Sequence, residues 1–333
     1  TSPYIVRFNE RMQINGEMIP DDELCRITEE IKPLADSIFE QPTEFEMVTA
    51  IAFAWFARRK CDIVVCEVGM GGEFDATNVI GAPEAAVLCN IGLDHTEVLG
   101  DTLEKIAATK SGIIKPGCDA VLYRSTDGVE AVVEQRCREV GATLHKVDFT
   151  GLHLRSHSLE GQVFDFGGRE ALHLPLLGEH QLHNAAVALT TLDVLQKRGW
   201  QITEADIRRG LSHVTWPGRF QIIRRDPLFL IDGGHNPQCI QALAQNIADY
   251  LPNRPLTVLT GVLSDKDYHC MYRSVADHAV EFITVTPDNP RALPAQELAK
   301  YLASFGKPVT ACDSVADGVR LAIDHAGKDG TVL

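Results

Sequence analysis

Short apolar runs alternate with amphipathic stretches along most of the chain of 333 residues. Apolar side chains recur at helical spacing over 43–59, and a compact apolar run follows at 62–66. Strands are predicted at 62–66, 85–91 and 120–123, and helices at 43–59, 102–110 and 127–140. Buried strands that alternate with helices are typical of a mostly parallel sheet covered on both faces.

The stretch 143–177 has a different pattern, with alternating polar and apolar residues, several glycines and no helical periodicity. It predicts antiparallel hairpins at the edge of the first domain. Helices are predicted next at about 180–198 and 203–212. The dipeptide Pro217-Gly218 then predicts a hinge.

After this hinge the alternation of strands and helices restarts. Strands are predicted at 228–232, 256–261, 281–285 and 308–311, helices at 237–250, 267–279, 294–304 and 315–326, and the first half of a buried strand at the end. The predicted fold class is therefore α/β with two doubly wound domains. The larger domain, 1–214, has a mostly parallel sheet plus a small antiparallel β region, and the smaller, Rossmann-like C-terminal domain covers 219–333.

Composition narrows the class of protein. The formal net charge of −15 argues against a nucleic-acid partner, because phosphate binding needs clustered Lys and Arg. No apolar run approaches the roughly 20 residues that span a bilayer, so no membrane partner is expected. The nine cysteines include no CxxC pair, which favours a reducing cytoplasm over a secreted disulfide framework.

Polar side chains follow the first two predicted strands. Glu67 comes directly after the strand at 62–66, and His95 follows the strand at 85–91. Ligands of open α/β sheets bind beyond the carboxyl ends of the strands, so this pair predicts a Mg²⁺ site if a phosphate supplies further oxygens. The alternatives are a solvated strand-end carboxylate for Glu67 and a loop or capping histidine for His95.

Two further features of this region are weaker indications of a functional site. Lys110 lies in the last turn of the predicted helix 102–110, where a cation is favourable at a helix C-terminus. The glycine-rich run Gly69–Gly72 does not match a dinucleotide fingerprint. It predicts a tight backbone approach to a ligand.

The second domain offers Asp232-Gly-Gly-His235-Asn236-Pro237, which follows a strand and opens a helix. This order suits a nucleotide or anion site at a helix N-terminus. A simple βα turn explains Asn236 as a cap and Pro237 as the first helical residue, but it leaves Asp232 and His235 without a role. Arg219, just past the predicted hinge, is either a phosphate ligand or a solvated linker arginine.

Taken together, these segments resemble the folylpolyglutamate synthase/dihydrofolate synthase family, relatives of the Mur peptidoglycan ligases. The matching segments are Thr1–Arg11, Ile14–Gly16, Phe45–Phe53, Glu67–Gly72, Asp75–Asn78, Asn90–His95, Lys110–Lys115, Gly178–Gln181 with Asn184, Trp216–Arg219, Asp232–Pro237 and Asp265–Asp267. One such motif is weak, but this many in order are specific. Glu73 departs from the pattern, since many relatives carry a basic residue there.

The resemblance implies roles for individual residues. Glu67 and His95 would bind Mg²⁺, Lys110 would be a carbamylated lysine, and Arg219 would join these three in catalysis. ATP, a substrate, would lie against Gln181, Asn184, Arg219, Asp232 and His235, with Asp232 near the ribose or adenine. The folate and glutamate side would include Thr1, Ser2, Pro3, Arg7, Phe8, Asn9, Asp75, Thr77, Asn78 and His235.

The implied activity is ATP-dependent formation of an amide bond between L-glutamate and a folate or dihydropteroate carboxylate, through an acyl phosphate. Residues 1–214 would be the ATP-binding central domain and 219–333 the glutamate-ligase domain, in a cytoplasmic monomer. Whether the first glutamate, later ones or both are added stays open.

The family's glycine-rich phosphate loop, of the GTNGKGS type, is absent from residues 1–333. We expect it upstream of Thr1, and we expect the chain without it to bind ATP poorly and turn nothing over. The alternatives are a Mur-type peptidoglycan ligase, which the segment Thr1–Arg11 disfavours, and a catalytically inert folate- or nucleotide-binding homologue.

Overall fold

The structure is a computed structural model that describes residues 4–333. Its residues form two compact units. Unit 1 contains the described residues up to Phe149 together with Ala186–Ile202, and unit 2 contains Thr150–Ala185 and Thr203–Leu333. The division runs through helix α6 (Glu179–Lys197). It differs from the boundary predicted between residues 214 and 219, which stays a prediction about the functional domains.

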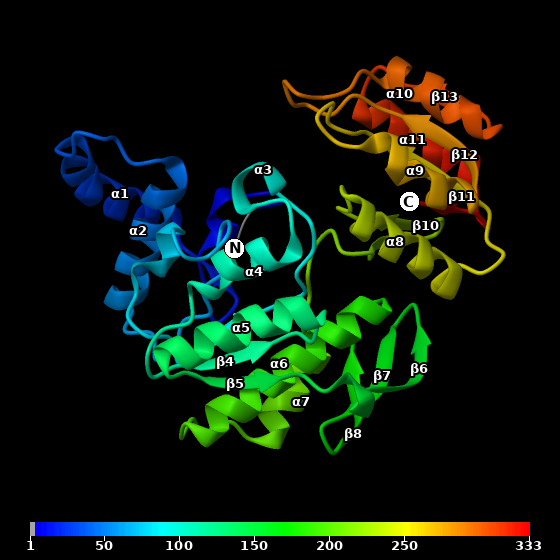
Figure 1. Ribbon diagram of the computed structural model, residues 1–333. Helices are drawn as coiled ribbons and strands as arrows, with labels where there is room; N and C mark the ends of the chain where they lie inside the picture. The colour runs from blue at the N-terminus through cyan, green and yellow to red at the C-terminus, as the bar shows by residue number, and fades with distance from the viewer. Residues whose placement is uncertain (1–3) are drawn as a thin grey trace. The chain divides into compact units, whose positions relative to one another are not determined.

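Unit 1 contains a three-stranded parallel sheet in the order β3-β4-β5 (Figure 1). Its strands are β3 (Ala85–Leu88), β4 (Asp119–Leu122) and β5 (Thr143–Lys146). Helix α5 (Asp127–Val140) packs on the sheet through Val133 and Cys137. Helix α4 (Leu103–Ser111) is capped by Thr102, whose side chain accepts a hydrogen bond from the Lys105 amide.

A second part of unit 1 is a helical pair, α1 (Asp21–Asp36) and α2 (Glu44–Arg58). Helix α2 confirms its prediction and begins with a capping box between Thr43 and Glu46. The unpredicted helix α1 packs against it around Ile27 and Trp55. Smaller elements complete the unit: η1 (Phe8–Arg11), β1 (Gln13–Ile14), β2 (Glu17–Met18), η2 (Ala76–Val79), α3 (Thr96–Leu99) and η3 (Phe149–Gly151).

The predicted buried strand over 62–66 is wrong. This segment pairs with no strand among the described residues. Its apolar side chains are open to solvent, with Ile63 44% exposed and Val65 97% exposed. An apolar run becomes a buried strand only where neighbouring elements cover it, and the described elements leave this segment uncovered.

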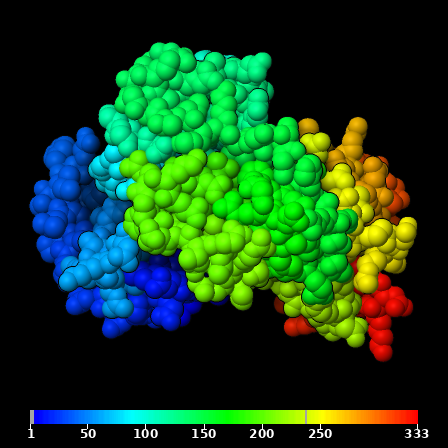
Figure 2. Space-filling view, turned by 90° about the horizontal axis from the view of Figure 1, so that it is seen from below, coloured from blue at the N-terminus to red at the C-terminus, as the bar shows by residue number. Residues whose placement is uncertain are grey.

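Unit 2 begins with a three-stranded antiparallel sheet of β6 (His153–Ser158), β7 (Gly161–Phe166) and β8 (Arg169–Leu174). This confirms the antiparallel prediction and corrects its extent. Residues 143–146 form the parallel strand β5, and the three antiparallel strands belong to unit 2. Every residue of β6 is exposed, and Figure 2 shows the green side chains of this region at the surface.

The main sheet of unit 2 has six strands in the order β13-β12-β11-β14-β10-β9. The strands are β9 (Gln221–Arg225), β10 (Leu228–Ile231), β11 (Leu256–Thr260), β12 (Ala279–Thr284), β13 (Val309–Ala311) and β14 (Thr331–Val332). All neighbours are parallel except β9, which was not predicted and runs antiparallel to β10. The predicted doubly wound pattern is confirmed.

Helices cover both faces of this sheet (Figure 1). They are α8 (Pro237–Tyr250), α9 (Tyr268–Ala276), α10 (Ala295–Leu302) with η4 (Ala303–Phe305), and α11 (Val315–Ala326), while α7 (Glu204–Ser212) packs on β8. No helix among residues 4–333 is both long and apolar enough to cross a membrane.

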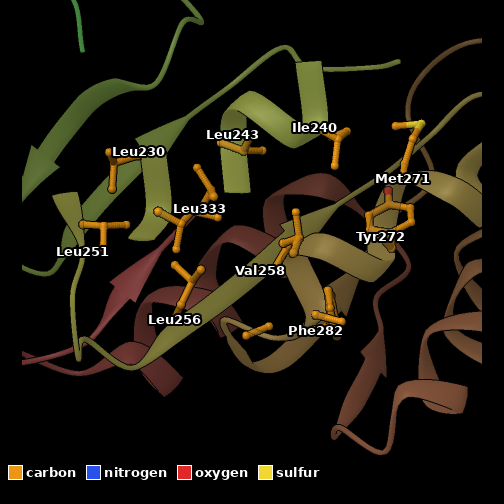
Figure 3. Packing of buried hydrophobic residues seen from close by; sticks show 14 of the residues in the cluster. Leu230, Ile240, Leu243, Leu251, Leu256, Val258, Met271, Tyr272, Phe282 and Leu333 are labelled. Atoms are coloured by element: carbon orange, nitrogen blue, oxygen red, sulfur yellow. The ribbon is translucent and has the colours of Figure 1, made fainter. Parts of the chain in front are cut away.

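Successive residues of the central strands enter two different cores. Leu230 and Phe282 pack with α8 and α9, and Figure 3 shows this cluster around Val258 and Leu333. Their chain neighbours Phe229 and Ile283 pack with α11 on the opposite face. This alternation follows from the period of two residues along a strand. It holds the carboxyl ends of the strands, where Asp232 lies, on a rigid support.

Candidate active-site residues

The glycine-rich loop after Glu67 packs on helix α4. A Cβ built at Gly72 would lie 2.7 Å from the Lys110 carbonyl oxygen and 2.9 Å from that of Thr109. One at Gly69 would lie 2.5 Å from the ring of Phe45. These close approaches are made to the protein's own helices α2 and α4, and the predicted approach to a ligand stays a prediction. The loop reaches the turn of α4 that carries Lys110.

Asp75, Thr77 and Asn78 hold this loop in shape. Asp75 Oδ2 accepts a hydrogen bond from the Met70 amide at 2.9 Å, and its Oδ1 accepts one from the Thr77 amide at 3.0 Å. Asn78 Nδ2 donates to the carbonyl oxygen of Glu73 at 3.1 Å. Their predicted contact with substrate stays a prediction, while their local bonds explain the loop geometry.

Glu67 and Lys110 both lie near the end of strand β3. Cys89, which follows that strand, is an exposed residue, yet the protein around its sulfur desolvates the thiol and raises its pKa. The Lys110 charge lowers this thiol pKa and the Glu67 charge raises it further. Cys89 therefore lies within the electrostatic range of both charged groups. A shared site for Glu67 and Lys110 stays a prediction.

His95 has an unusual backbone and an available ring. It precedes α3 with φ of 48°, in the left-handed region that non-glycine residues visit rarely. Its own amide donates to Asp94 Oδ1 at 2.9 Å. Among residues 4–333 its imidazole makes no hydrogen bond or ion pair, and the residue is exposed. The ring can therefore accept a ligand.

Unit 1 offers few protein ligands for a metal ion. No group of three or more His, Cys, Asp or Glu side chains among residues 4–333 could hold a metal. Glu67 supplies one carboxylate and His95 one imidazole. Mg²⁺ is commonly held by one or two carboxylates plus water and substrate phosphates. Binding of Mg²⁺ by Glu67 and His95 stays a prediction, and such an ion would take most of its ligands from phosphate and water.

Two of the predicted folate-side residues line a cavity near the start of the chain. Arg7 and Asn9 line a space of about 280 Å³ with Ile19 and Asp21. Arg7 Nη2 lies 3.0 Å from both carboxylate oxygens of Asp21. Phe8 packs against the core of the α1–α2 pair. The predicted residues Thr1, Ser2 and Pro3 lie outside the described residues.

Glu10 organises this segment and was not predicted as a site residue. Its carboxylate accepts hydrogen bonds from the amides of Ile5 at 2.7 Å, Val6 at 2.9 Å and Arg7 at 2.7 Å. The bonds from Ile5 and Arg7 lower the Glu10 pKa most. A glutamate between Asn9 and Arg11 carries no sequence signal for this role, because the donors lie on a loop without regular structure.

In unit 2, the small antiparallel sheet positions the start of α6. Gln162 of β7 donates to the carbonyl oxygens of Leu176 at 2.8 Å and Gly178 at 3.0 Å. The Gly178 amide donates to the hydroxyl of Tyr250 in α8 at 3.1 Å. These bonds tie the loop before α6 to β7 and α8. They set the place of the predicted ATP ligands on the first turns of α6.

Those ligands, Gln181 and Asn184, are themselves coupled. Asn184 Nδ2 donates to Gln181 Oε1 at 3.2 Å. Gln181 is buried and Asn184 is exposed. The amide groups of Gln181 and Asn184 thus lie together one helical turn apart, as expected for residues spaced by three.

Asp232 and His235 lie on the loop after β10, as predicted. Asp232 Oδ2 accepts from the Phe220 amide at 2.8 Å and Oδ1 from the Gly234 amide at 2.7 Å. His235 Nδ1 lies 2.9 Å from the Gly233 carbonyl oxygen. Asn236 caps α8 by accepting from the Cys239 amide, which confirms the capping alternative for that residue.

His180 shows that these segments of unit 2 converge. Burial lowers the pKa of its imidazole, while the charge of Asp232 raises it and that of Arg219 lowers it again. His180, in the first turn of α6, therefore lies within the electrostatic range of both charged residues. His180 stands in the quoted segment Gly178–Gln181 but was not predicted as a site residue. Its neighbours come from distant parts of the chain, which only the fold brings together.

Comparison with known proteins decides the family. Residues 31–192 match the model of the Mur ligase middle domain, and residues 218–333 match that of the Mur ligase glutamate ligase domain. The chain is 37% identical over 307 residues to folylpolyglutamate synthase of Lacticaseibacillus casei, covering 88% of this chain and 71% of that protein. This chain belongs to the folylpolyglutamate synthase family. Dihydrofolate synthase/folylpolyglutamate synthase of Bacillus subtilis is 35% identical and covers 90% of this chain and 72% of its own length.

Solved structures of the family have the same fold. Folylpolyglutamate synthase of Mycobacterium tuberculosis, solved with ADP and AMPPCP, superposes with a TM-score of 0.89 at 32% identity. It covers 100% of this chain and 80% of that one. FolC of E. coli, solved with DHPP and ADP, gives a TM-score of 0.86 at 29% identity and covers 100% and 77%. The resemblance found in the sequence motifs is confirmed.

Proposed function

We propose that this chain carries the machinery of an ATP-dependent ligase that joins L-glutamate to a folate or dihydropteroate carboxylate. Membership of the folylpolyglutamate synthase family over the whole chain is the observation that carries the proposal. The convergence of α6, Arg219 and Asp232 supports a nucleotide site in unit 2. The acceptor is dihydropteroate, a reduced folate or both.

The reaction proceeds in two steps. A carboxylate is a poor electrophile, so the acceptor carboxylate first attacks the γ-phosphorus of ATP and forms an acyl phosphate, releasing ADP. The glutamate amine then attacks the acyl carbon, the C–O bond to phosphate breaks, and the amine proton is lost to base or water. Negative charge builds on phosphoryl oxygens in both steps, so positioned cationic groups lower the barriers.

In unit 1, Glu67 and His95 are the residues that would hold Mg²⁺. When bound, this ion neutralises phosphate charge. Lys110 has no hydrogen bond or ion pair for its ammonium among residues 4–333 and lies beside the Glu67 loop. We assign Lys110 as the carbamylated lysine. Its carbamate group would add oxygen donors to those of Glu67. Loss of activity on removing dissolved CO₂, restored by bicarbonate, would support this modification.

In unit 2, Gln181 and Asn184 contact ATP, and Arg219 contacts its phosphates. Asp232 and His235 belong to the same site. On the acceptor side, Arg7, Phe8 and Asn9 with Thr1, Ser2 and Pro3 form one group of contacts. Asp75, Thr77 and Asn78 form the other, alongside their bonds within the loop.

We further propose functional domains at 1–214 and 219–333, a monomer, and a cytoplasmic protein. The glutamate-ligase family model begins at residue 218, which supports the second boundary. No disulfide bond joins any two cysteines among residues 4–333, which supports a reducing compartment.

The test uses protein expressed from its complete reading frame. We expect Mg²⁺-dependent ADP release that requires both L-glutamate and either dihydropteroate or a reduced folate, with a product heavier by one glutamate residue. Turnover of UDP-muramyl substrates in place of folates would instead favour a Mur-type ligase. Nucleotide binding without turnover of either acceptor would favour a catalytically inert homologue.

The variant Glu67→Ala tests the assigned site directly. We expect it to lose most of its turnover and to need much more Mg²⁺ for the remainder. Glu97→Ala is the matched control, because Glu97 is an exposed carboxylate on the neighbouring helix α3. Turnover of Glu67→Ala equal to that of Glu97→Ala would exclude Glu67 from the metal site.

A further inference from the structure

The turn that carries Arg219 has an unfavourable backbone. Gly218 has φ of 73° and Phe220 has φ of 44°, so the residue on each side of Arg219 has a left-handed backbone conformation. Glycine adopts this region freely, but a bulky residue such as Phe is a genuine outlier there. Such residues persist only where the surrounding structure holds them, and they gather at functional sites.

Two anchors hold Phe220 in this conformation. The residue is 2% exposed, and its ring centroid lies 6.1 Å from that of Tyr250 in the core under α8. Its amide donates to Asp232 Oδ2 at 2.8 Å. The other side of the turn is tied as well, because the Gly233 amide donates to the Gly218 carbonyl oxygen at 2.8 Å. Both neighbours of Arg219 are thus fastened to residues 232–233.

The register of the sheet explains why an aspartate is needed at this point. Strand β9 pairs with β10 up to Gln221 opposite Ile231. The next pair would be Phe220 opposite Asp232, but the ladder ends there. The Asp232 carboxylate replaces the missing backbone acceptor, and its second oxygen accepts from the Gly234 amide at 2.7 Å. The two amides bond to different oxygens of the carboxylate, and an asparagine in the same position would turn its NH₂ group, a donor, toward one of them.

We infer that Asp232 is a positioning residue for Arg219: its carboxylate holds the strained turn that presents the guanidinium beside Gly233. A Cβ built at Gly233 would lie 4.0 Å from Arg219 Nη1, so the guanidinium passes over bare backbone. This inference rests on the proposed function, in which Arg219 contacts the phosphates of ATP. It differs from the sequence expectation that Asp232 acts through the ribose or adenine.

A double-mutant cycle with two nucleotides separates the two roles. In protein from the complete reading frame, Asp232→Asn should lose about 10- to 100-fold in kcat/KM for ATP, since small misplacements of a catalytic group have costs of this size. The same loss should appear with 2′,3′-dideoxy-ATP, which has no ribose hydroxyls. Adding Asp232→Asn to Arg219→Ala should cost little more than Arg219→Ala alone.

Additive losses in the cycle would overturn the inference, and so would a loss that disappears with 2′,3′-dideoxy-ATP. Asp249→Asn is the control, because Asp249 is an exposed aspartate on α8. If Asp232→Asn does not fold, Gly218→Ala strains the same turn without touching the carboxylate. It should reproduce the loss with both nucleotides, and an unchanged kcat/KM would refute the inference.

Different results would contradict the proposed function and the positioning role of Asp232. A wild-type protein that joins glutamate to no folate or pteroate contradicts the proposed function. In that case the same cycle is measured by ATP binding in place of turnover. Asp232→Asn that weakens ATP binding only when Arg219 is present still supports the positioning role, and independent effects refute it.

Discussion

At the scale of single residues, several polar side chains in and next to the candidate site fix the conformation of the backbone around them. Asp75 accepts two backbone amides of its own loop, and Asp232 accepts one from its own loop and one from Phe220, which precedes β9. Glu10 accepts three. A loop without regular structure must satisfy its amides in some other way, and a carboxylate can accept several at once.

Glu10→Gln should weaken binding of the acceptor. Glutamine has a single acceptor oxygen, and its amide nitrogen would face backbone donors, so the segment of Ile5 to Arg7 should loosen. We expect KM for the folate acceptor to rise several-fold while KM for ATP stays unchanged, as measured by steady-state kinetics. Glu17→Gln, an exposed glutamate of the adjacent hairpin, should match the wild type. An equal rise of both KM values would rule out this local role.

Gly72→Ala should displace the turn of α4 that carries Lys110. The new methyl group would meet the Lys110 and Thr109 carbonyl oxygens at 2.7 and 2.9 Å, and backbone cannot move aside like a side chain. Overpacking of this kind costs about 1–3 kcal/mol of unfolding free energy. We expect such a loss in urea denaturation together with reduced ligase turnover. Gly81→Ala is the control, because a Cβ there meets nothing within 4 Å. A Gly72→Ala protein as stable and active as this control would contradict the close packing.

At the scale of elements, an ionic cluster joins the segment after α6 to the starts of two strands in unit 1. Arg198 donates through Nε to Glu84 at 2.5 Å and through Nη1 to Asp119 at 2.8 Å. His145 Nε2 lies 2.7 Å from the other oxygen of Asp119. Burial by itself raises the Asp119 pKa, but the hydrogen bonds from His145 and Arg198 lower it below its ordinary value.

Asp119→Asn should destabilise unit 1 in a way that depends on pH. Because the folded-state pKa is lowered, the carboxylate stabilises the fold fully above its unfolded pKa of about 3.9 and loses this contribution as pH falls through the folded value. We expect a loss of about 1–3 kcal/mol near neutral pH in urea unfolding, as for hydrogen bonds to charged groups. The difference from the wild type should shrink below about pH 4. Asp36→Asn, in an exposed pair with Lys32, should change little. A difference that does not vary with pH would show that charge is not its cause.

At the scale of the whole molecule, the net negative charge of the protein repels the proposed substrates. The chain carries 46 acidic and 31 basic residues, a formal net charge of −15, while ATP, glutamate and folates are anions. A net field of this sign slows the encounter with anions, and dissolved salt screens it.

We therefore expect kcat/KM for the acceptor to rise when ionic strength increases from about 0.01 M to about 0.15 M, where the screening length falls from about 30 Å to about 8 Å. The rise should be larger for folates that carry more glutamates, and kcat should change little. Steady-state kinetics with a neutral salt checks this. A fall of kcat/KM over the same range would show that local positive charge dominates the approach.

The sequence by itself predicted most of the elements and the family. Periodicity is a local property, so α5 and α8 could be located from it to within a residue or two, and the order of the motifs from Glu67 to Asp265 was enough to indicate the family. The prediction of a strand at 62–66 was wrong for the converse reason. Its apolar residues are the signal of a buried strand, but burial depends on neighbours that the segment itself does not encode.

Only the tertiary structure decided what the candidate residues touch. The sequence could place Asp232 at a strand end, but not show that its carboxylate holds the amide of Phe220 across an unpredicted antiparallel pair. It could mark Gly72 as a close approach, but not name Lys110 as the partner. Each of these contacts joins residues distant in the chain, and the packing of elements that brings them together is a property of the whole fold.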